Sequence, residues 1–176
     1  MEDTFTMIIG IGIAIVLMCV IPLITLADRH DDIAQTEIQS ITTDFVNECA
    51  KTGKITESSW DTFQSKLNSQ GNATYDIDIE VAIMNPTGSK KSEQLQQGAI
   101  GTNDYYSEYT TSIVDQLKRN GKYDLKSGDM ITVKVQNSSA TSGDTMTSGF
   151  LKTTNGDSVK IKADATATVV TNGSNT

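Results

Sequence analysis

The chain has 176 residues, a net charge of −8 and 37% apolar residues. About 150 residues remain outside one long apolar segment, which is enough for one compact domain but not comfortably for two. The acidic balance argues against a nucleic-acid partner, because binding to nucleic acid needs a basic face that neutralises phosphates. The two cysteines, Cys19 and Cys49, do not make a disulfide framework.

An apolar segment lies near the N-terminus. Residues 7–27 read MIIGIGIAIVLMCVIPLITLA and carry no charge. As a helix rising about 1.5 Å per residue, this run spans roughly 30 Å, the thickness of the hydrocarbon core of a bilayer. No basic segment precedes it and no small-residue cleavage site follows it, so we predict a retained membrane helix rather than a signal peptide. Pro22 removes a backbone hydrogen bond and is expected to bend the helix or to loosen its last turns.

The helical pattern continues beyond the apolar run. Apolar side chains recur at helical spacing up to Gly53, where a helix C-cap is expected. The pattern predicts one helix from about residue 4 to about residue 52, apolar all round in its first half and amphipathic in its second. Cys19 and Cys49 would lie roughly 45 Å apart on this helix and cannot pair. The buried stripe of the second half is expected to contain Ala34, Ile38, Ile41, Phe45 and Cys49, widened by Ile33 and Val46.

A helix and a strand open the polar domain. The helix is predicted over residues 56–69, with Thr56 or Ser58 as its cap and with Trp60, Phe63 and Leu67 on its buried face. The strand is predicted over residues 75–84, because apolar and acidic side chains alternate along it. We interpret its carboxylates as a solvated sheet face rather than a calcium site, since a straight strand lacks the turns of a calcium loop. The buried face would hold Tyr75, Ile77, Ile79 and Val81, and the solvated face Asp76, Asp78 and Glu80.

A third helix is predicted over residues 104–120, after a polar loop and before a closing Gly121. A tyrosine cluster can bind a ligand by stacking, but helical spacing favours a role in the core for these tyrosines. The apolar stripe of this helix would hold Tyr105, Tyr109, Ile113, Val114 and Leu117.

The remainder of the chain is predicted to be β-structure. One strand begins at Met130, and two more over residues 145–154 and 158–170 flank Asn155-Gly156, a strong hairpin signal. The polar tail after residue 170 is expected to fray. The fold class is therefore α+β: a long N-terminal helix followed by a small head with one antiparallel sheet and two short helices. The divisions are residues 1–28 for the apolar helix, 29–52 for its amphipathic continuation and 53–176 for the head.

The sequence contains no recognisable catalytic constellation. His30 is the single histidine, and no Cys or Glu accompanies it at metal-ligand spacing. No nucleophile elbow, phosphate-binding loop or dinucleotide-binding motif occurs. Cys49 lies on the apolar stripe without a neighbouring base, which favours packing over reactivity. We therefore expect no enzymatic activity, no catalytic residues and no cofactor or metal site.

The layout of a long helix with an apolar first half, a proline and an amphipathic second half, followed by an α+β head, resembles the type IV pilin superfamily. This superfamily includes pilins, pseudopilins and the related Tad-type and archaeal subunits. The stretch IGIAIVLMCVIPLITLADRHDDIA carries the resemblance. Pro22 lies where bacterial pilins often have a helix-loosening proline, if Met1 is counted as the first mature residue. The resemblance covers the long helix, and the head matches only in general architecture.

The resemblance implies a structural subunit of a type IV pilus-like extracellular filament. Such a subunit is inserted in the cytoplasmic membrane before assembly and lies on the cell surface afterwards. Its partners would be copies of itself and the pilus assembly machinery, and not nucleic acid. The residues expected to pack in the filament core are Phe5, Ile8, Ile11, Ile15, Leu17, Val20, Pro22, Leu23 and Leu26.

Two features depart from the family pattern. Family precursors carry a short basic leader ending in Gly, which this sequence does not show. Met1 is therefore either the mature start, or the chain is not a substrate of prepilin peptidase. Family members usually place a glutamate at the fifth mature position, where this chain has Phe5. By resemblance, Glu2 or Asp3 would instead neutralise the terminal amine of a neighbouring subunit.

A second interpretation from another class remains open. The same layout fits a single-pass, signal-anchored surface protein whose head binds a partner or a cell-wall polymer. The two interpretations differ in what surrounds the apolar helix, which is copies of itself in one and lipid in the other.

Overall fold

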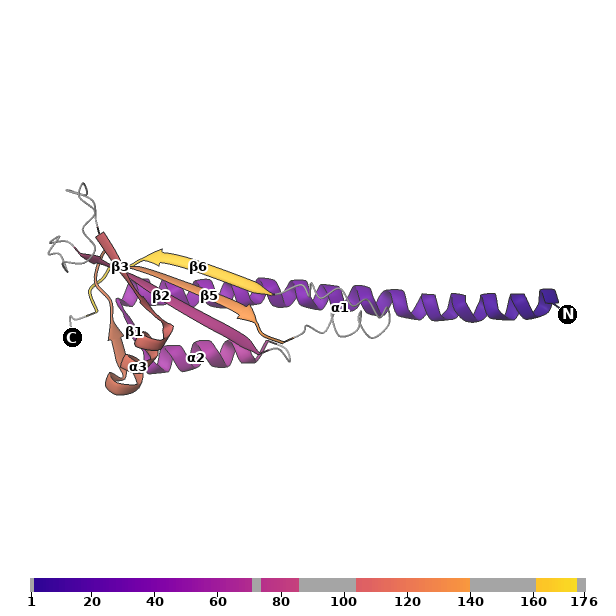
Figure 1. The fold of residues 1–176 in the computed structure, drawn as a ribbon, viewed down its shortest axis with the longest axis horizontal. Coiled ribbons are helices and arrows are strands. Elements are labelled where there is room, and N and C mark those ends of the chain that lie inside the picture. The colour runs from indigo at the N-terminus through magenta and orange to yellow at the C-terminus, as the bar shows by residue number, and fades with distance from the viewer. Residues whose placement is uncertain (1, 71–73, 86–103, 140–160, 174–176) are drawn as a thin grey trace.

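The computed structural model describes residues 2–70, 74–85, 104–139 and 161–173. One long helix, α1 (Glu2–Thr52), runs the length of the molecule, and its second half packs against a mixed helix and sheet head (Figure 1). The first half of α1 projects from the head as a single rod. The expected α+β architecture, with an apolar N-terminal helix and antiparallel sheet, is confirmed at this level.

The long helix is continuous over its whole predicted length. It passes through Pro22 as one helical element and ends at Gly53. Gly53 has a φ of 69°, and its N–H donates to the carbonyl oxygen of Cys49 at 2.9 Å. A left-handed glycine that bonds back into the last turn is a common way to end a helix, so the predicted C-cap is confirmed.

The second half of α1 anchors the head. Its predicted stripe is buried at Ile38, Phe45 and Cys49 and half-buried at Ala34 and Ile41. Of the two residues expected to widen the stripe, Val46 is buried, but Ile33 is 64% exposed. The prediction for Ile33 was wrong because Ile33 lies on the side of the helix turned away from the sheet and α2.

The next elements are β1 (Lys54–Thr56) and α2 (Glu57–Asn68). Thr56 caps α2: its hydroxyl accepts from the Ser59 N–H, and the Ser59 hydroxyl accepts from the Thr56 N–H, each at 3.1 Å. This reciprocal pair holds the turn between β1 and α2. The face of α2 turned to α1 carries Trp60, Phe63 and Leu67, which are buried as predicted.

The main sheet has four antiparallel strands in the order β3-β2-β5-β6. Their bounds are β2 Tyr75–Asn85, β3 Asp104–Tyr109, β5 Met130–Asn137 and β6 Lys162–Thr168. On β2, Ile79 and Val81 are buried while Asp76 and Asp78 are exposed, so the predicted alternation is confirmed. All three described helices contribute to the hydrophobic cluster on the buried face of this sheet.

The predicted helix over residues 104–120 was wrong in its first third. Residues Asp104–Tyr109 form β3, which pairs with β2, and α3 comprises only Thr110–Asn120. Ile113 and Leu117 are buried as expected, but Tyr105 and Tyr109 are 44% and 62% exposed. Aromatic residues favour a pleated strand as readily as a helix face, and pairing with β2 decided between the two.

A small second sheet joins the segment after α1 to the segment after α3. In it, β1 pairs antiparallel with β4 (Lys122–Asp124), so the described part of the head has two sheets rather than the one predicted. The described part of the C-terminal tail is also ordered, against expectation: the N–H of Gly173 donates to the carbonyl oxygen of Leu125 at 2.9 Å. The predicted strand over 145–154 and the hairpin at 155–156 lie outside the described residues.

The outer edge of β6 is bound by side chains of α1. The amide of Gln35 bonds both to the carbonyl oxygen and, at 3.0 Å, to the N–H of Lys162. The amide of Gln39 donates to the carbonyl oxygen of Asp164 at 2.8 Å. These glutamines satisfy backbone groups that an edge strand otherwise leaves open to pairing with another chain.

The junction at Gly53 yields a stability prediction. A Cβ at Gly53 would collide with the carbonyl oxygen of Thr171 and lie 2.6 Å from the amide nitrogen of Gly173, whereas a Cβ at Gly121 would meet open space. Both glycines have φ near 70°. Gly121→Ala should therefore cost about 1 kcal/mol, from the left-handed backbone alone. Gly53→Ala should cost at least about 3 kcal/mol, because backbone atoms must also move.

Urea unfolding followed by the fluorescence of Trp60, the single tryptophan, measures both variants. Equal losses in the two variants would contradict the close packing of the C-terminal segment against Gly53.

Candidate functional site

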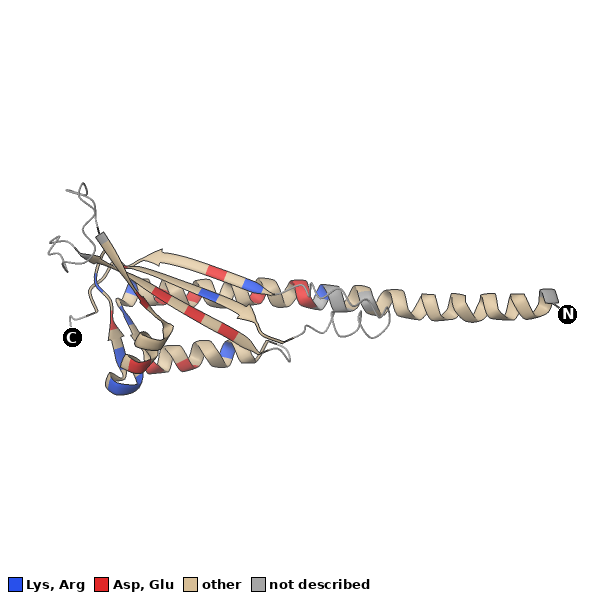
Figure 2. Cartoon of the chain, in the orientation of Figure 1, with Lys and Arg blue, Asp and Glu red and all other residues tan. Residues whose placement is uncertain are grey.

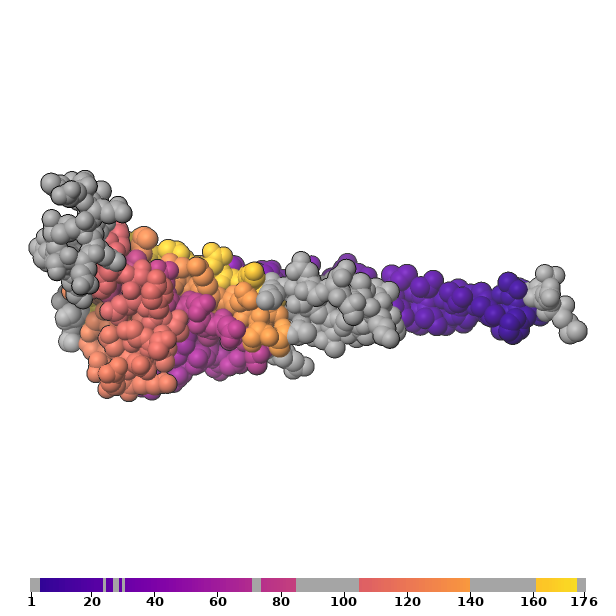
Figure 3. Space-filling model, in the orientation of Figure 1, coloured from indigo at the N-terminus to yellow at the C-terminus, as the bar shows by residue number. Residues whose placement is uncertain are grey.

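The most distinctive surface of the molecule is the first half of α1. The segment Thr4–Leu23 is long and apolar enough to cross a membrane, and none of it is buried against the other residues that the structure describes. Figure 3 shows this part of α1 as a bare rod beyond the head. Apolar side chains are exposed around it, from Phe5 at 66% to Leu26 at 65%. Soluble monomers rarely expose a continuous apolar surface of this extent, so the rod needs an apolar environment.

The rod carries few polar side chains. Figure 2 shows no Lys, Arg, Asp or Glu along its described part. The hydroxyl of Thr25 donates to the carbonyl oxygen of Ile21 at 3.0 Å, which satisfies it within the helix. Pro22 has no N–H, so the carbonyl oxygen of Met18 lacks its usual helical donor. The rod is therefore suited to hydrocarbon or to packing against other apolar helices.

The predicted filament-core residues all lie on this rod. All are exposed except Val20, which is half-buried. At 3.6 residues per turn, most of them fall on one side of the helix, and Leu17 and Val20 lie on the other. The side chains of Glu2 and Asp3, predicted to neutralise a neighbouring amine, lie outside what the structure describes.

In the second half of α1, the exposed side of the helix becomes acidic. Its exposed positions include Asp32, Glu37, Asp44 and Glu48, with Lys51 at the end of the helix. The boundary between the apolar rod and the charged surface thus lies close to residue 30.

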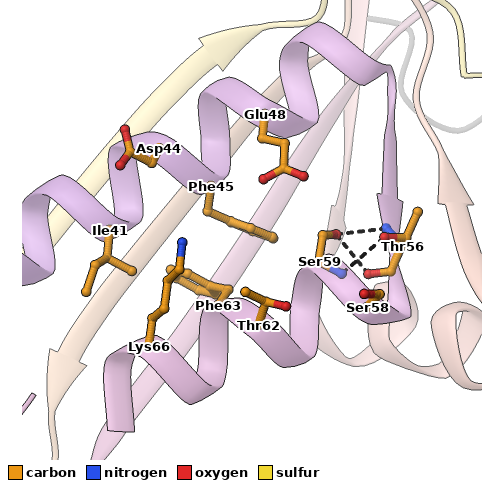
Figure 4. Close-up of a pocket in the computed structure, with 10 residues that line it drawn as sticks. All are labelled: Ile41, Asp44, Phe45, Glu48, Thr56, Ser58, Ser59, Thr62, Phe63 and Lys66. Atoms are coloured by element: carbon orange, nitrogen blue, oxygen red, sulfur yellow. Dashed lines mark hydrogen bonds between the residues drawn. The ribbon is translucent and has the colours of Figure 1, made fainter. Parts of the chain in front are cut away.

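Figure 4 shows a shallow groove between α1 and α2. Its volume is about 190 Å³, and the stacked rings of Phe45 and Phe63 form its floor with centroids 4.3 Å apart. Asp44 and Glu48 approach it from α1 and Lys66 from α2. A groove of this size is smaller than most ligand sites, and its aromatic floor serves to hold α2 against α1.

A larger groove lies between α2 and α3, with a volume of about 430 Å³. Trp60, Ile77 and Val114 supply its apolar lining, and Glu57, Asp61 and Lys118 lie among its polar residues. The described residues that line it include no Ser, Cys or His.

Two titratable groups in the core, Cys49 and Tyr123, are held in their neutral forms. Burial, with a smaller contribution from Glu48, raises the pKa of the Cys49 thiol to about 12. Burial also raises the pKa of Tyr123, whose hydroxyl donates to a carboxylate oxygen of Glu108 at 3.0 Å. A raised thiol pKa opposes formation of the nucleophilic thiolate, so Cys49 is packed rather than reactive. Among the described residues, no group of three His, Cys, Asp or Glu side chains is placed to hold a metal ion.

Comparisons of this chain with family models, with curated proteins and with solved structures found no significant match. Its function must therefore be argued from the exposed surfaces described above.

The buried thiol gives a pH prediction. Because the pKa of Cys49 rises from 9.0 to about 12 on folding, the folded state holds this proton more tightly than the unfolded chain does. The stability from this group is fully present below pH 9 and is lost as pH rises from 9 through 12. The loss should approach about 1.4 kcal/mol per pH unit in this window.

The measurement is urea unfolding between pH 8 and pH 11. Cys49→Ala is the control: it lowers stability at pH 8 by removing packing, but it should flatten the dependence between pH 9 and pH 10, before tyrosine ionisation dominates. An unchanged slope in Cys49→Ala would show that other groups cause the pH dependence.

Proposed function

We propose that this chain is a structural subunit of a type IV pilus-like extracellular filament, which assembles through the apolar half of α1. The observation that carries the proposal is the uncovered rod: an all-round apolar helix, continuous with a helix that is fixed to a folded head. The protein would lie in the cytoplasmic membrane before assembly and on the cell surface after it.

The energy of burial supports assembly. Side chains of the rod such as Ile8, Ile15 and Leu26 are 59–65% exposed, so most of their apolar surface has no partner within the chain. Burying some twenty such side chains contributes on the order of tens of kcal/mol as an upper bound. Lipid covers this apolar surface while the subunit is stored in the membrane. After extraction into water, the apolar rods of other copies must cover it.

The position of the head supports a filament rather than a closed oligomer. The head packs along the second half of α1, so the rod is left clear for neighbours on every side. Copies that pack rod against rod place their heads outside the bundle. Contacts between different surfaces of successive copies generate helical filaments where the rotation between copies does not close into a ring.

The alternative proposal is a signal-anchored surface protein whose rod stays in lipid while the head binds a partner or polymer. The span Thr4–Leu23 favours it equally, since length and composition alone do not distinguish lipid from neighbouring helices. Under either proposal the protein acts by binding or assembly rather than by catalysis.

Photo-crosslinking tests the filament proposal. Benzoylphenylalanine in place of Phe5, which is 66% exposed at the start of the rod, reacts with whatever surrounds that position. In cells of the native host, or of a host with a compatible assembly system, irradiation should give a ladder of dimers, trimers and larger species. A rod that stays in lipid would give monomers carrying lipid adducts.

Benzoylphenylalanine in place of Trp60 is the matched control, because that side chain is 8% exposed and should crosslink only within its own chain. Protease shaving of intact cells shows in parallel whether the head reached the surface. Surface-exposed heads with no ladder from position 5 would contradict the filament proposal and support the anchored alternative.

A further inference from the structure

Three tyrosines of the chain lie exposed on β3, where a helical core stripe was expected. Tyr105 and Tyr109 are on one face of this strand and Tyr106 is on the other, because side chains alternate along a strand. The face of Tyr105 and Tyr109 is the polar face of the sheet, since Tyr109 pairs with Glu80 and Tyr105 with Met84. Tyr109 is 62% exposed and Tyr105 is 44% exposed, so neither belongs to the hydrophobic core.

A groove of about 380 Å³ lies beside Tyr109 on that face. Its walls come from four elements: β2, β3, the start of α3 and β5. Tyr109 is its aromatic member and Ile79 its one aliphatic residue. The polar side chains that line it include Asp78, Glu80, Thr111, Thr132 and Lys134. The volume is within the range of small-molecule sites.

The groove is already organised by hydrogen bonds. The hydroxyl of Thr110 accepts from the N–H of Ile79 at 2.8 Å, which ties the start of α3 to β2 where β3 has ended. Ser107 donates to a carboxylate oxygen of Glu80 at 2.7 Å, and Thr132 shares a hydrogen bond with Thr166 at 3.0 Å. The side chains of Thr110, Glu80 and Thr132 are therefore held in place before any ligand arrives, which lowers the entropy lost on binding.

This combination of groups matches the chemistry of a saccharide. A pyranose ring presents a C–H face that stacks on an aromatic ring, and a rim of hydroxyls that both donate and accept. Tyr109 supplies the ring, Asp78 and Glu80 supply acceptors, and Lys134 supplies a donor. A second ring, Tyr105, lies four residues away along β3, or roughly 13 Å. That separation suits a short oligosaccharide rather than one sugar unit.

The composition of the groove argues against a protein–protein contact at this place. The centres of such contacts are depleted in charged residues and rich in apolar side chains, whereas this groove has the charged side chains of Asp78, Glu80 and Lys134. The side chain of its one aliphatic residue, Ile79, is buried on the other face of the sheet. The carboxylates also disfavour an anionic sugar, by like-charge repulsion. A neutral saccharide fits best.

We propose that the groove between Tyr109 and Lys134, extended along β3 to Tyr105, binds a neutral oligosaccharide. The site lies on the sheet face opposite to the helices and therefore points away from α1. A single subunit would bind the oligosaccharide whether or not it is part of a filament. If the proposed function also holds, α1 lies at the axis and the site repeats on the fibre surface, where many weak sites act together.

The test uses the full-length chain in lauryldimethylamine oxide, because a glycoside detergent would compete for the site. The probes are cellohexaose, chitohexaose and maltohexaose, with a galacturonic acid hexamer as the anionic comparison, followed by saturation-transfer NMR and titration. At least one neutral probe should bind with a Kd of about 1 mM, and more tightly than the anionic probe. Tyr109→Ala should weaken binding about tenfold, and Asp78→Asn and Tyr105→Ala severalfold.

Tyr106→Ala is the matched control, because Tyr106 is 51% exposed on the same strand but on the opposite face. It should leave binding unchanged, and urea unfolding should show that all variants remain folded. The proposal is overturned if no neutral probe binds, or if Tyr106→Ala weakens binding as much as Tyr109→Ala does. It is also overturned if Tyr109→Ala leaves sugar binding intact but abolishes self-association, which would make the face a contact between copies.

Discussion

The structure depends on one constraint: the first half of α1 is apolar on every side, and no other described part of the chain buries any of the span Thr4–Leu23. The hydrophobic effect makes that exposure in water too costly to persist. The rest of the molecule is arranged so that the rod stays free. The head packs only on the second half of α1, and the charged surface of the helix begins where the head does. A partner of the rod, whether lipid or copies of itself, is therefore part of the protein's working state.

The head is fixed to the second half of α1 by contacts at several levels. Phe45 and Phe63 stack between α1 and α2, and the Gln35 and Gln39 amides bind the open edge of β6. At the far end, Gly53 turns the chain out of the helix against the C-terminal segment. The opposite, polar face of the sheet carries Tyr109 and Lys134.

Local patterns predicted much of this architecture. The helix from about residue 4 to residue 52, the cap at Thr56 and the alternating burial of β2 all follow from periodicity and capping chemistry, which act over a few residues.

Other features depend on contacts between distant parts of the chain. Ile33 was misassigned because helical spacing places it beside the buried stripe of α1 but does not show how far around the helix the sheet extends. Tyr105 and Tyr109 fit helical spacing and were placed in a helix, yet long-range pairing with β2 made them part of an exposed strand. The pairing of β1 with β4 could not be foreseen, since two three-residue strands carry no period of their own. The groove beside Tyr109 could not be predicted from the sequence either, because its residues come from four separate elements that only the folded structure brings together.

The central claim is that copies of the apolar rod cover one another. Cryo-electron microscopy of fibres sheared from the surface of cells that produce the protein tests it most directly. The account predicts fibres whose core is a bundle of rods, with Phe5, Ile15 and Leu23 buried between neighbouring copies and with the four-stranded sheets outside. Surface fibres that lack this chain, together with a protein that remains monomeric in the membrane fraction of the same cells, would contradict the account.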